Sequence, residues 1–161
     1  MGVTAGEPDR VSTPTAPAPR PAHRHAGLLA LIFVGGAVGT AARAALENLL
    51  PAEPAGIPWM TLAINVIGSL VLALLVEWLA RTGDDVGRRR ASRLTLGTGA
   101  LGGFTTYSTF AVETVQRATS GSAAVGLVYA VGSIVLGAAA AAAGFVGARR
   151  LTRASGAEPL R

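Results

Sequence analysis

Four long apolar stretches alternate with short polar connections along the chain, at about 26–49, 59–80, 93–117 and 122–148. Each is long enough for a helix that crosses the ~30 Å hydrocarbon core of a bilayer, which takes about 20 residues. The first connection is broken by prolines, the second is charged, and the third is a tight turn at 119–122. We therefore predict an all-α integral membrane protein, a small bundle of four transmembrane helices.

The two ends of the chain lack this pattern. Residues 1–25 are rich in Pro, Ala and Thr with little apolar surface to bury, so we predict a disordered tail there. The four-span domain covers 26–149, and residues 150–161 form a short basic tail. Ala-Arg-Ala at 42–44 also offers a cleavage site for a secretory signal, although the preceding tail is long and proline-rich for that role and three more spans follow.

The third apolar stretch contains GGFTTYSTF at 102–110, with two glycines and five hydroxyl side chains. Glycine weakens a helix, and unpaired hydroxyls are costly in hydrocarbon. We predict that Gly102-Gly103 followed by Phe104-Thr105-Thr106 interrupts the third helix near its middle. Irregular backbone at that depth persists only in a protein interior or along a cavity, and its freed carbonyls can coordinate a small cation. A kink that only eases packing is the alternative.

Several other polar or aromatic residues lie at membrane depth, three or four positions apart on shared helix faces. They are Thr61, Asn65 and Ser69 on the second span, Phe110 and Glu113 on the third, Tyr129 and Ser133 on the fourth, and Arg43 on the first. Polar groups at this depth often mark an ion or substrate route. Each also has a structural alternative: hydroxyls bond to the carbonyl one turn back, Arg43 extends to the headgroups, and Asn65 only joins two helices.

The composition excludes several classes of function. Half of the residues are hydrophobic and 14% are charged, cysteine is absent, and both histidines, His23 and His25, precede the first span. Thiol chemistry and a zinc or iron site within the membrane are therefore excluded, and no nucleophile–base pair of an enzyme is visible. All 14 basic residues are arginines. They flank apolar runs, which favours contact with anionic lipid headgroups over nucleic acid.

Three separated segments together resemble the Fluc (CrcB) family of fluoride channels. GGAVGTAAR at 35–43 is similar to that family's glycine-rich first-helix motif, and TLAINVIGS at 61–69 to its second-helix motif around an asparagine. GGFTTYSTF resembles the third-helix signature, which usually has phenylalanine where this chain has Tyr107. The resemblance covers about 28–148 and implies a passive, fluoride-selective channel that exports fluoride from the cytoplasm.

The resemblance also implies an assembly and a set of site residues. Family members are antiparallel dimers with two pores along the subunit interface and a structural sodium ion at the centre. Carried onto this chain, the main-chain carbonyls of Gly102 and Thr105 would bind sodium. The ion pathway would contain Asn65, Phe110, Tyr107, Thr61, Tyr129, Ser133, Glu113 and Arg43. Gly137 stands where a further serine can occur, so Tyr107 and Gly137 are departures from the family pattern.

The implied chemistry agrees with the residue types. Fluoride holds its water tightly, so a selective path must replace that water with strong donors. The asparagine amide and the hydroxyls can donate, and aromatic ring edges carry partial positive charge. Apart from Arg43 and Glu113, these residues are neutral, which suits a path that must also release the ion.

The arginines are unevenly divided between the two sides of the membrane. Four spans place both termini on one side, and twelve arginines lie there: Arg10, Arg20, Arg24, Arg81, Arg88, Arg89, Arg90, Arg93, Arg149, Arg150, Arg153 and Arg161. The opposite side has Arg117 near a span end. The positive-inside rule therefore predicts a multi-pass inner (plasma) membrane protein with both termini in the cytoplasm. Such a bias also suggests one half of an antiparallel heterodimer, as an alternative to a homodimer.

Two other functions remain open. A small multidrug-type cation/proton antiporter needs a carboxylate buried in the membrane, for which Glu113 is the candidate, but it gives the broken helix no role. A non-transporting assembly subunit needs only the small residues at four-residue spacing, such as Gly35 with Gly39 and Gly99 with Gly103. That function leaves Asn65 unexplained.

Overall fold

The computed structural model describes residues 25–53, 56–154 and 156, and all regular structure in these residues is helical. The elements are α1 (Ala26–Leu49), α2 (Trp59–Arg81), α3 (Gly87–Ser92), the π-helix η2 (Arg93–Leu101), α4 (Gly102–Phe104), α5 (Tyr107–Thr119) and α6 (Ala123–Ala154). The predicted tail before His25 lies outside the described residues, as do 157–161.

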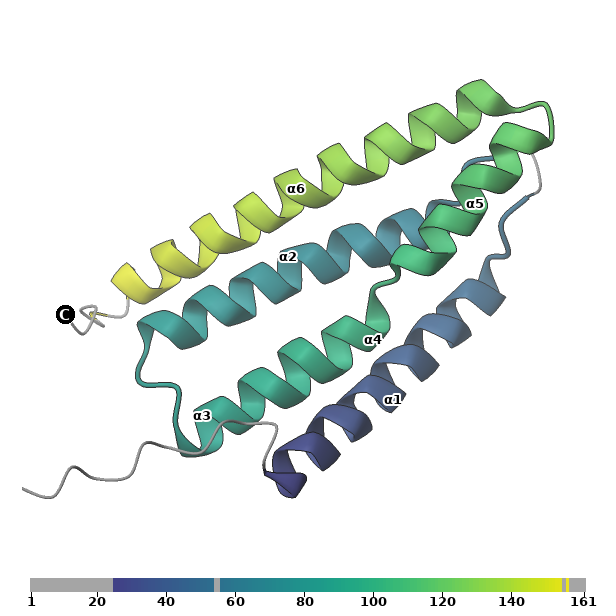
Figure 1. Ribbon diagram of the computed structural model, residues 1–161. Helices are drawn as coiled ribbons and strands as arrows, with labels where there is room; N and C mark the ends of the chain where they lie inside the picture. The colour runs from purple at the N-terminus through teal and green to yellow at the C-terminus, as the bar shows by residue number, and fades with distance from the viewer. Residues whose placement is uncertain (1–24, 54–55, 155, 157–161) are drawn as a thin grey trace, which may run out of the picture.

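The helices form four roughly antiparallel passes, of which the third is composite (Figure 1). That pass consists of α3, η2, α4 and α5. Helix α2 packs mainly on α6, and α1 packs mainly on η2 and α4, while α5 contacts α6. Helices α1, α2 and α6 are each long and apolar enough to cross a membrane. The all-helical prediction is therefore confirmed, three of the four predicted spans are helices able to cross a membrane, and the chain is a membrane protein.

The third pass is broken near its middle, as predicted, but not at the glycines. The helix continues through Gly102, whose φ and ψ are −66° and −34°, and through Gly103. Thr105 and Thr106 are extended instead, with φ/ψ of −77°/156° and −145°/124°. These β-branched residues suit extended backbone. Of the predicted segment 102–106, residues 102–104 are therefore helical, and the break consists of Thr105 and Thr106.

The glycines bring the first and third passes into backbone contact. A Cβ atom on Gly103 would lie 2.4 Å from the carbonyl oxygen of Gly36, and one on Gly39 would lie 2.0 Å from that of Ala100. A Cβ atom on Gly99 would lie 2.7 Å from the carbonyl oxygen of Ile32. Membrane helices associate through such close packing because lipid offers little hydrophobic drive. The seam holds η2 and α4 against α1 and so fixes where the break lies.

Several arginines near the α2–α3 connection are used within the protein. Arg81 Nε donates to Thr152 Oγ1 at 2.9 Å, which ties α2 to α6. Arg93 forms an ion pair with Asp85 across the connection, and Arg89 donates to the carbonyl of Leu79 at 2.9 Å. Helix α6 continues beyond its apolar part to Ala154, so Arg149, Arg150 and Arg153 extend from a helix.

Candidate functional site

The break in the third pass is held by one side chain of α2. The Asn65 amide nitrogen donates to the carbonyl oxygen of Thr106 at 3.0 Å, and its amide oxygen accepts from the Thr106 N–H at 2.8 Å. Asn65 thus satisfies both backbone groups that Thr106 loses by leaving the helix. The amide nitrogen has two hydrogens. One is used by Thr106, and the second is left for another acceptor.

Thr106 also begins the second half of the pass. Its Oγ1 accepts from the Thr109 N–H at 3.1 Å, which makes Thr106 the N-cap of α5. Among the described residues, no hydrogen bond uses the N–H groups of Tyr107 or Ser108, the first two residues of α5. A helix N-terminus carries about half a positive charge and attracts anions. The break therefore presents a positive helix end at the middle of the bundle.

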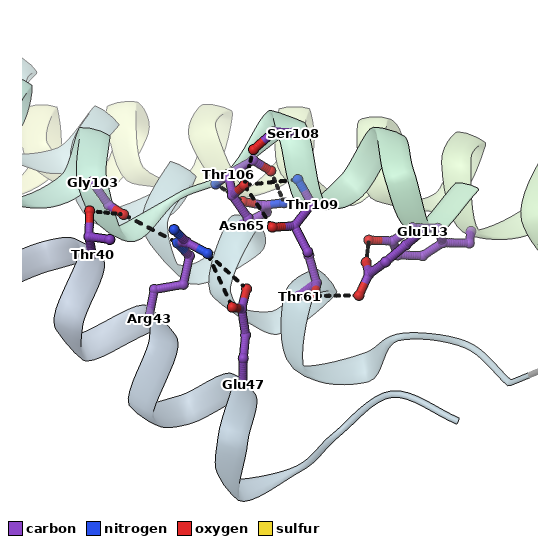
Figure 2. A network of polar contacts seen from close by, with 11 residues as sticks. Thr40, Arg43, Glu47, Thr61, Asn65, Gly103, Thr106, Ser108, Thr109 and Glu113 are labelled. Carbon is purple, nitrogen blue, oxygen red and sulfur yellow. Dashed lines mark hydrogen bonds and ion pairs between the residues drawn. The ribbon is translucent and has the colours of Figure 1, made fainter. Parts of the chain in front are cut away.

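The other side of the break presents carbonyl oxygens. Leu101 O accepts from the N–H and from the hydroxyl of Thr105, both at 3.0 Å. Gly103 O accepts from Thr40 Oγ1 and from Arg43 Nε, each at 3.4 Å (Figure 2). In the described part of the chain, no hydrogen bond across the break uses the carbonyl oxygens of Gly102 or Thr105. Hydroxyl and guanidinium donors thus occupy the neighbouring carbonyls and leave these two for another partner.

Arg43 lies beside this break rather than extending to an interface. Its Nη1 forms an ion pair with Glu47 at 3.1 Å, one turn later on α1. Figure 2 shows its guanidinium between Glu47 and Gly103. The arginine is therefore a donor to the first half of the broken pass, with its charge offset by Glu47.

A second polar cluster lies at the end of the bundle near the α1–α2 connection. Both carboxylate oxygens of Glu113 accept hydroxyl protons, one from Thr61 at 2.9 Å and one from Tyr129 at 2.8 Å. Thr61 and Tyr129 are each only 2% exposed. The carboxylate is held by neutral donors from α2 and α6, so three passes meet at this cluster.

Aromatic rings connect the cluster with the break. The Phe110 ring centroid lies 5.5 Å from that of Tyr129 and 5.9 Å from that of Tyr107, both in tilted arrangements. Tyr129 is buried, whereas Tyr107 is 80% exposed. The row therefore runs from the interior, at Tyr129, to the outer surface of the single chain, at Tyr107.

An open groove with a volume of about 410 Å³ runs along the break. It is lined by Asn65, Ser69, Leu72, Thr105, Thr106, Tyr107, Phe110, Ser133, Ile134 and Gly137. The Oγ atom of Ser133 is buried and makes no hydrogen bond to other described residues. A Cβ atom on Gly137 would lie 3.7 Å from Ser69 Oγ, so a serine there would extend the hydroxyl row. The groove thus collects an unused amide hydrogen, an unpartnered hydroxyl and a helix N-terminus.

The structure divides the predicted pathway residues into three groups. Asn65, Tyr107, Phe110 and Ser133 line the groove, while Thr61, Glu113 and Tyr129 form the cluster and Arg43 lies with Gly103 on the α1 side. Thr105, predicted as a sodium ligand, also lines the groove. Thr106 was predicted as part of the break but not as the N-cap of α5. Its spacing of three from Thr109, directly before a helix, is the signal that would have identified it as an N-cap.

Comparison with known proteins agrees with this arrangement. Together, the composite third pass and the polar groove define a small helical membrane protein with a polar path between its helices. Residues 30–145 match the model of the family described as CrcB-like protein, Camphor Resistance (CrcB). The chain belongs to the CrcB family.

Named relatives include channels from several bacteria. The chain is 50% identical over 135 residues, 81% of this chain and 92% of the relative, to "Fluoride-specific ion channel FluC 2" of Leifsonia xyli. It is 49% identical over 111 residues, 69% of this chain and 78% of the relative, to "Fluoride-specific ion channel FluC 1" of Cutibacterium acnes. It is 45% identical over 114 residues, 67% of this chain and 85% of the relative, to "Fluoride-specific ion channel FluC" of Novosphingobium aromaticivorans.

Proposed function

We propose that this chain is a subunit of a fluoride-selective channel through which fluoride leaves the cytoplasm by passive diffusion. The observation that carries the proposal is the groove along the break. Asn65, Ser133 and the first residue of α5, Tyr107, line this groove, and no basic side chain is among the lining residues. Neutral donors can replace the hydration shell of a small anion and still release it.

The shape of the groove favours a second subunit as its other wall. The groove is open, and Tyr107 at its edge is 80% exposed although its ring packs on Phe110. A polar groove facing lipid would leave its donors unsatisfied, which is costly. An antiparallel second subunit would cover the groove and make the path a feature of the dimer interface.

A structural sodium ion at the centre of that dimer fits the donors that are present. Hard monovalent cations take oxygen ligands, and no group of His, Asp and Glu in the described residues is arranged to hold a metal. The carbonyl oxygens of Gly102 and Thr105 are left unused by the hydrogen bonds around the break. Two subunits related by symmetry would supply four such oxygens. The ion would offset the partial negative charge of these carbonyl oxygens and would hold the broken third passes of the two subunits together.

The structure gives less support to a proton-coupled antiporter. Such a mechanism needs a carboxylate that exchanges protons with the path, but both oxygens of Glu113 accept hydrogen bonds from buried hydroxyls. An assembly subunit would need the glycine seam alone and leaves the groove without a role.

Fluoride efflux from liposomes tests the proposal directly. The protein is purified either alone or together with a homologue whose arginines lie mainly on the opposite side of the membrane, and it is then reconstituted. Fluoride and chloride release are recorded with electrodes. Fluoride release without chloride release is expected from at least one of the two preparations. Equal rates for the two anions, or no fluoride release from either folded preparation, would refute the proposal. Asn65→Asp, which removes the donor, is the loss-of-function variant, and Gly132→Ala is the control because a Cβ atom there meets nothing within 4 Å.

A further inference from the structure

Arg117, near the C-terminal end of α5, is a buried cation that the proposed function does not use. Its exposed fraction is 2%, although it lies close to the end of a membrane helix where an arginine could extend into water. A buried charge is expensive unless it is hydrogen-bonded or paired. The partners of its guanidinium therefore indicate why the charge is kept inside.

Those partners are three backbone carbonyls from two segments of the chain. Nε donates to Gly56 O at 2.6 Å, Nη2 donates to Glu53 O at 3.2 Å, and Nη1 donates to Glu113 O at 2.9 Å. Glu53 and Gly56 belong to the connection between α1 and α2. No carboxylate in the described residues lies within ion-pairing distance of Arg117, so backbone carbonyls take the place of an acidic partner. The planar guanidinium suits such a fork, which an ammonium cannot reproduce.

The same guanidinium meets the polar cluster of the ion path. Its central carbon lies 5.9 Å from the centroid of the Tyr129 ring, a cation–π distance. The Tyr129 hydroxyl in turn donates to Glu113, whose backbone carbonyl accepts from Arg117. Arg117 thus fixes the ring of Tyr129 and the helical turn of Glu113 together, against the α1–α2 connection.

Close packing leaves the arginine little freedom to take another position. A Cβ atom on Gly126 of α6 would lie 3.3 Å from Arg117 Cβ and 3.1 Å from the carbonyl oxygen of Thr114. The absence of a side chain at Gly126 therefore lets α6 approach the stem of the arginine. The arrangement is more than a basic residue near a helix C-terminus, since such a residue only needs to approach the last carbonyls of its own helix.

We propose that Arg117 is a positioning residue of the ion path. It holds the Tyr129 ring and the Glu113 turn in the conducting arrangement by tying both to the α1–α2 connection. The inference rests on the proposed channel function, because Tyr129 and Glu113 matter to transport only if an ion passes them. Arg117 itself does not touch the ion in this arrangement.

The test separates the contact from its effect on transport. Because the chain has no cysteine, a spin label attached at Ala52→Cys reports only on the α1–α2 connection. Arg117→Gln is expected to make this label more mobile in liposomes, and the exposed Arg150→Gln is expected to leave it unchanged. An unchanged label in Arg117→Gln would overturn the proposed contact. This measurement needs no ion flow, so it stands even if the channel function fails.

Fluoride release then tests the effect on the path. Dilute reconstitution separates the fraction of vesicles that release fluoride from the rate of release in the active ones. A residue needed only for stability lowers the active fraction, whereas a positioning residue lowers the rate. We expect Arg117→Gln to lower the rate about tenfold or more through the lost charge-assisted hydrogen bonds, and Arg117→Lys to give an intermediate rate. A wild-type rate in either variant, or a fall in the active fraction alone, would overturn the proposal.

A second variant covers the case in which Arg117→Gln does not fold. Gly126→Ala keeps the charge but inserts a methyl group against the arginine stem, so a reduced rate and a more mobile label are expected. Gly132→Ala lies on the same helix with open space around it and is the matched control. Equal rates for the two alanine variants would contradict the positioning role.

Discussion

Asn65 and Thr106 form a two-way hydrogen-bonded pair, in which one amide side chain replaces both backbone partners of a residue outside the helix, at 3.0 and 2.8 Å. The pair links the middle of α2 to the break in the third pass. Asn65 also lines the groove, and its second amide hydrogen is not used by the bonds to Thr106. Asn65 thus both supports the break and lies in the proposed ion path.

Replacement of Asn65 separates these two roles. Asn65→Leu leaves the N–H and the carbonyl of Thr106 without hydrogen-bond partners. We expect each unsatisfied group to lower the free energy of unfolding by about 1–3 kcal/mol. Asn65→Asp keeps the acceptor for the N–H but places a second acceptor opposite the carbonyl and adds negative charge. We therefore expect Asn65→Asp to abolish fluoride release with a smaller loss of thermal stability. Melting temperatures in detergent and fluoride efflux measure the two effects, and normal efflux in Asn65→Asp would contradict the assignment.

The glycine seam gives a prediction about stability. Gly39→Ala and Gly103→Ala would place methyl groups 2.0 and 2.4 Å from backbone oxygens of the facing helix, so the two passes must separate. We expect each to cost about 1–3 kcal/mol, as overpacked cores do. Gly132→Ala has no neighbour within 4 Å and should be neutral or slightly stabilising, because alanine favours the helix. Thermal melting of the three variants in one detergent checks the order, and equal melting temperatures would refute the role of the seam.

Some of this seam and site could be predicted from the sequence, and some could not. The long apolar stretches of the sequence predicted where the four passes lie. The run of hydroxyl residues in the third stretch predicted where that pass is broken. Within the predicted segment 102–106 the structure places the break at Thr105 and Thr106 and keeps both glycines helical, because glycine spacing in a membrane serves close packing as well as flexibility. The pairing of Asn65 with Thr106, 41 positions apart, depends on how α2 meets the third pass. No local sequence pattern encodes this pairing. The carbonyl partners of Arg117 on the α1–α2 connection are also distant in the sequence, so they could not be predicted either.

Tyr107 allows a test of what the aromatic row contributes. Its ring contacts Phe110, and the residue is 80% exposed on the single chain. If the ring edge is what the path uses, Tyr107→Phe should keep fluoride efflux within about twofold, whereas Tyr107→Ala should lower it strongly. A loss in Tyr107→Phe would instead assign the role to the hydroxyl. Fluoride efflux at matched protein-to-lipid ratio measures both variants.

The Asp85–Arg93 pair predicts a weak dependence of stability on pH. The hydrogen bond from Arg93, opposed by partial burial and assisted by the charges of Arg93 and Arg90, lowers the pKa of Asp85. Because the folded-state pKa lies below the unfolded value, the stabilisation is present above about pH 4 and is lost as the pH falls through the folded-state pKa. The pair is exposed, so the effect should stay below about 1 kcal/mol. Melting from pH 6 to 3 should show this loss in the wild type and not in Asp85→Asn.

The distribution of arginines predicts that the chain inserts in a single orientation. It therefore also predicts a partner subunit whose arginines lie mainly at the opposite end of the bundle. The end of the bundle with the α2–α3 connection carries Arg88, Arg90, Arg150 and Arg153, whose side chains make no hydrogen bond or ion pair with another described residue. At the opposite end, Arg117 is buried among carbonyls. Positive residues keep their side of the membrane in the cytoplasm. An antiparallel homodimer needs the same chain to insert both ways, which this bias opposes.

Single-cysteine labelling in intact cells measures that orientation. A cysteine at Asp84, in the α2–α3 connection, should be shielded from a membrane-impermeant maleimide, whereas one at Ser120, in the α5–α6 turn, should react. Labelling of both positions would show dual insertion and refute the heterodimer. Reversal of the bias, with Arg88, Arg90, Arg150 and Arg153 changed to Gln and arginines added near Ser120, should reverse the pattern. If single insertion is found, fluoride efflux should require co-expression with an oppositely biased homologue, because only such a partner can present an antiparallel face to the groove.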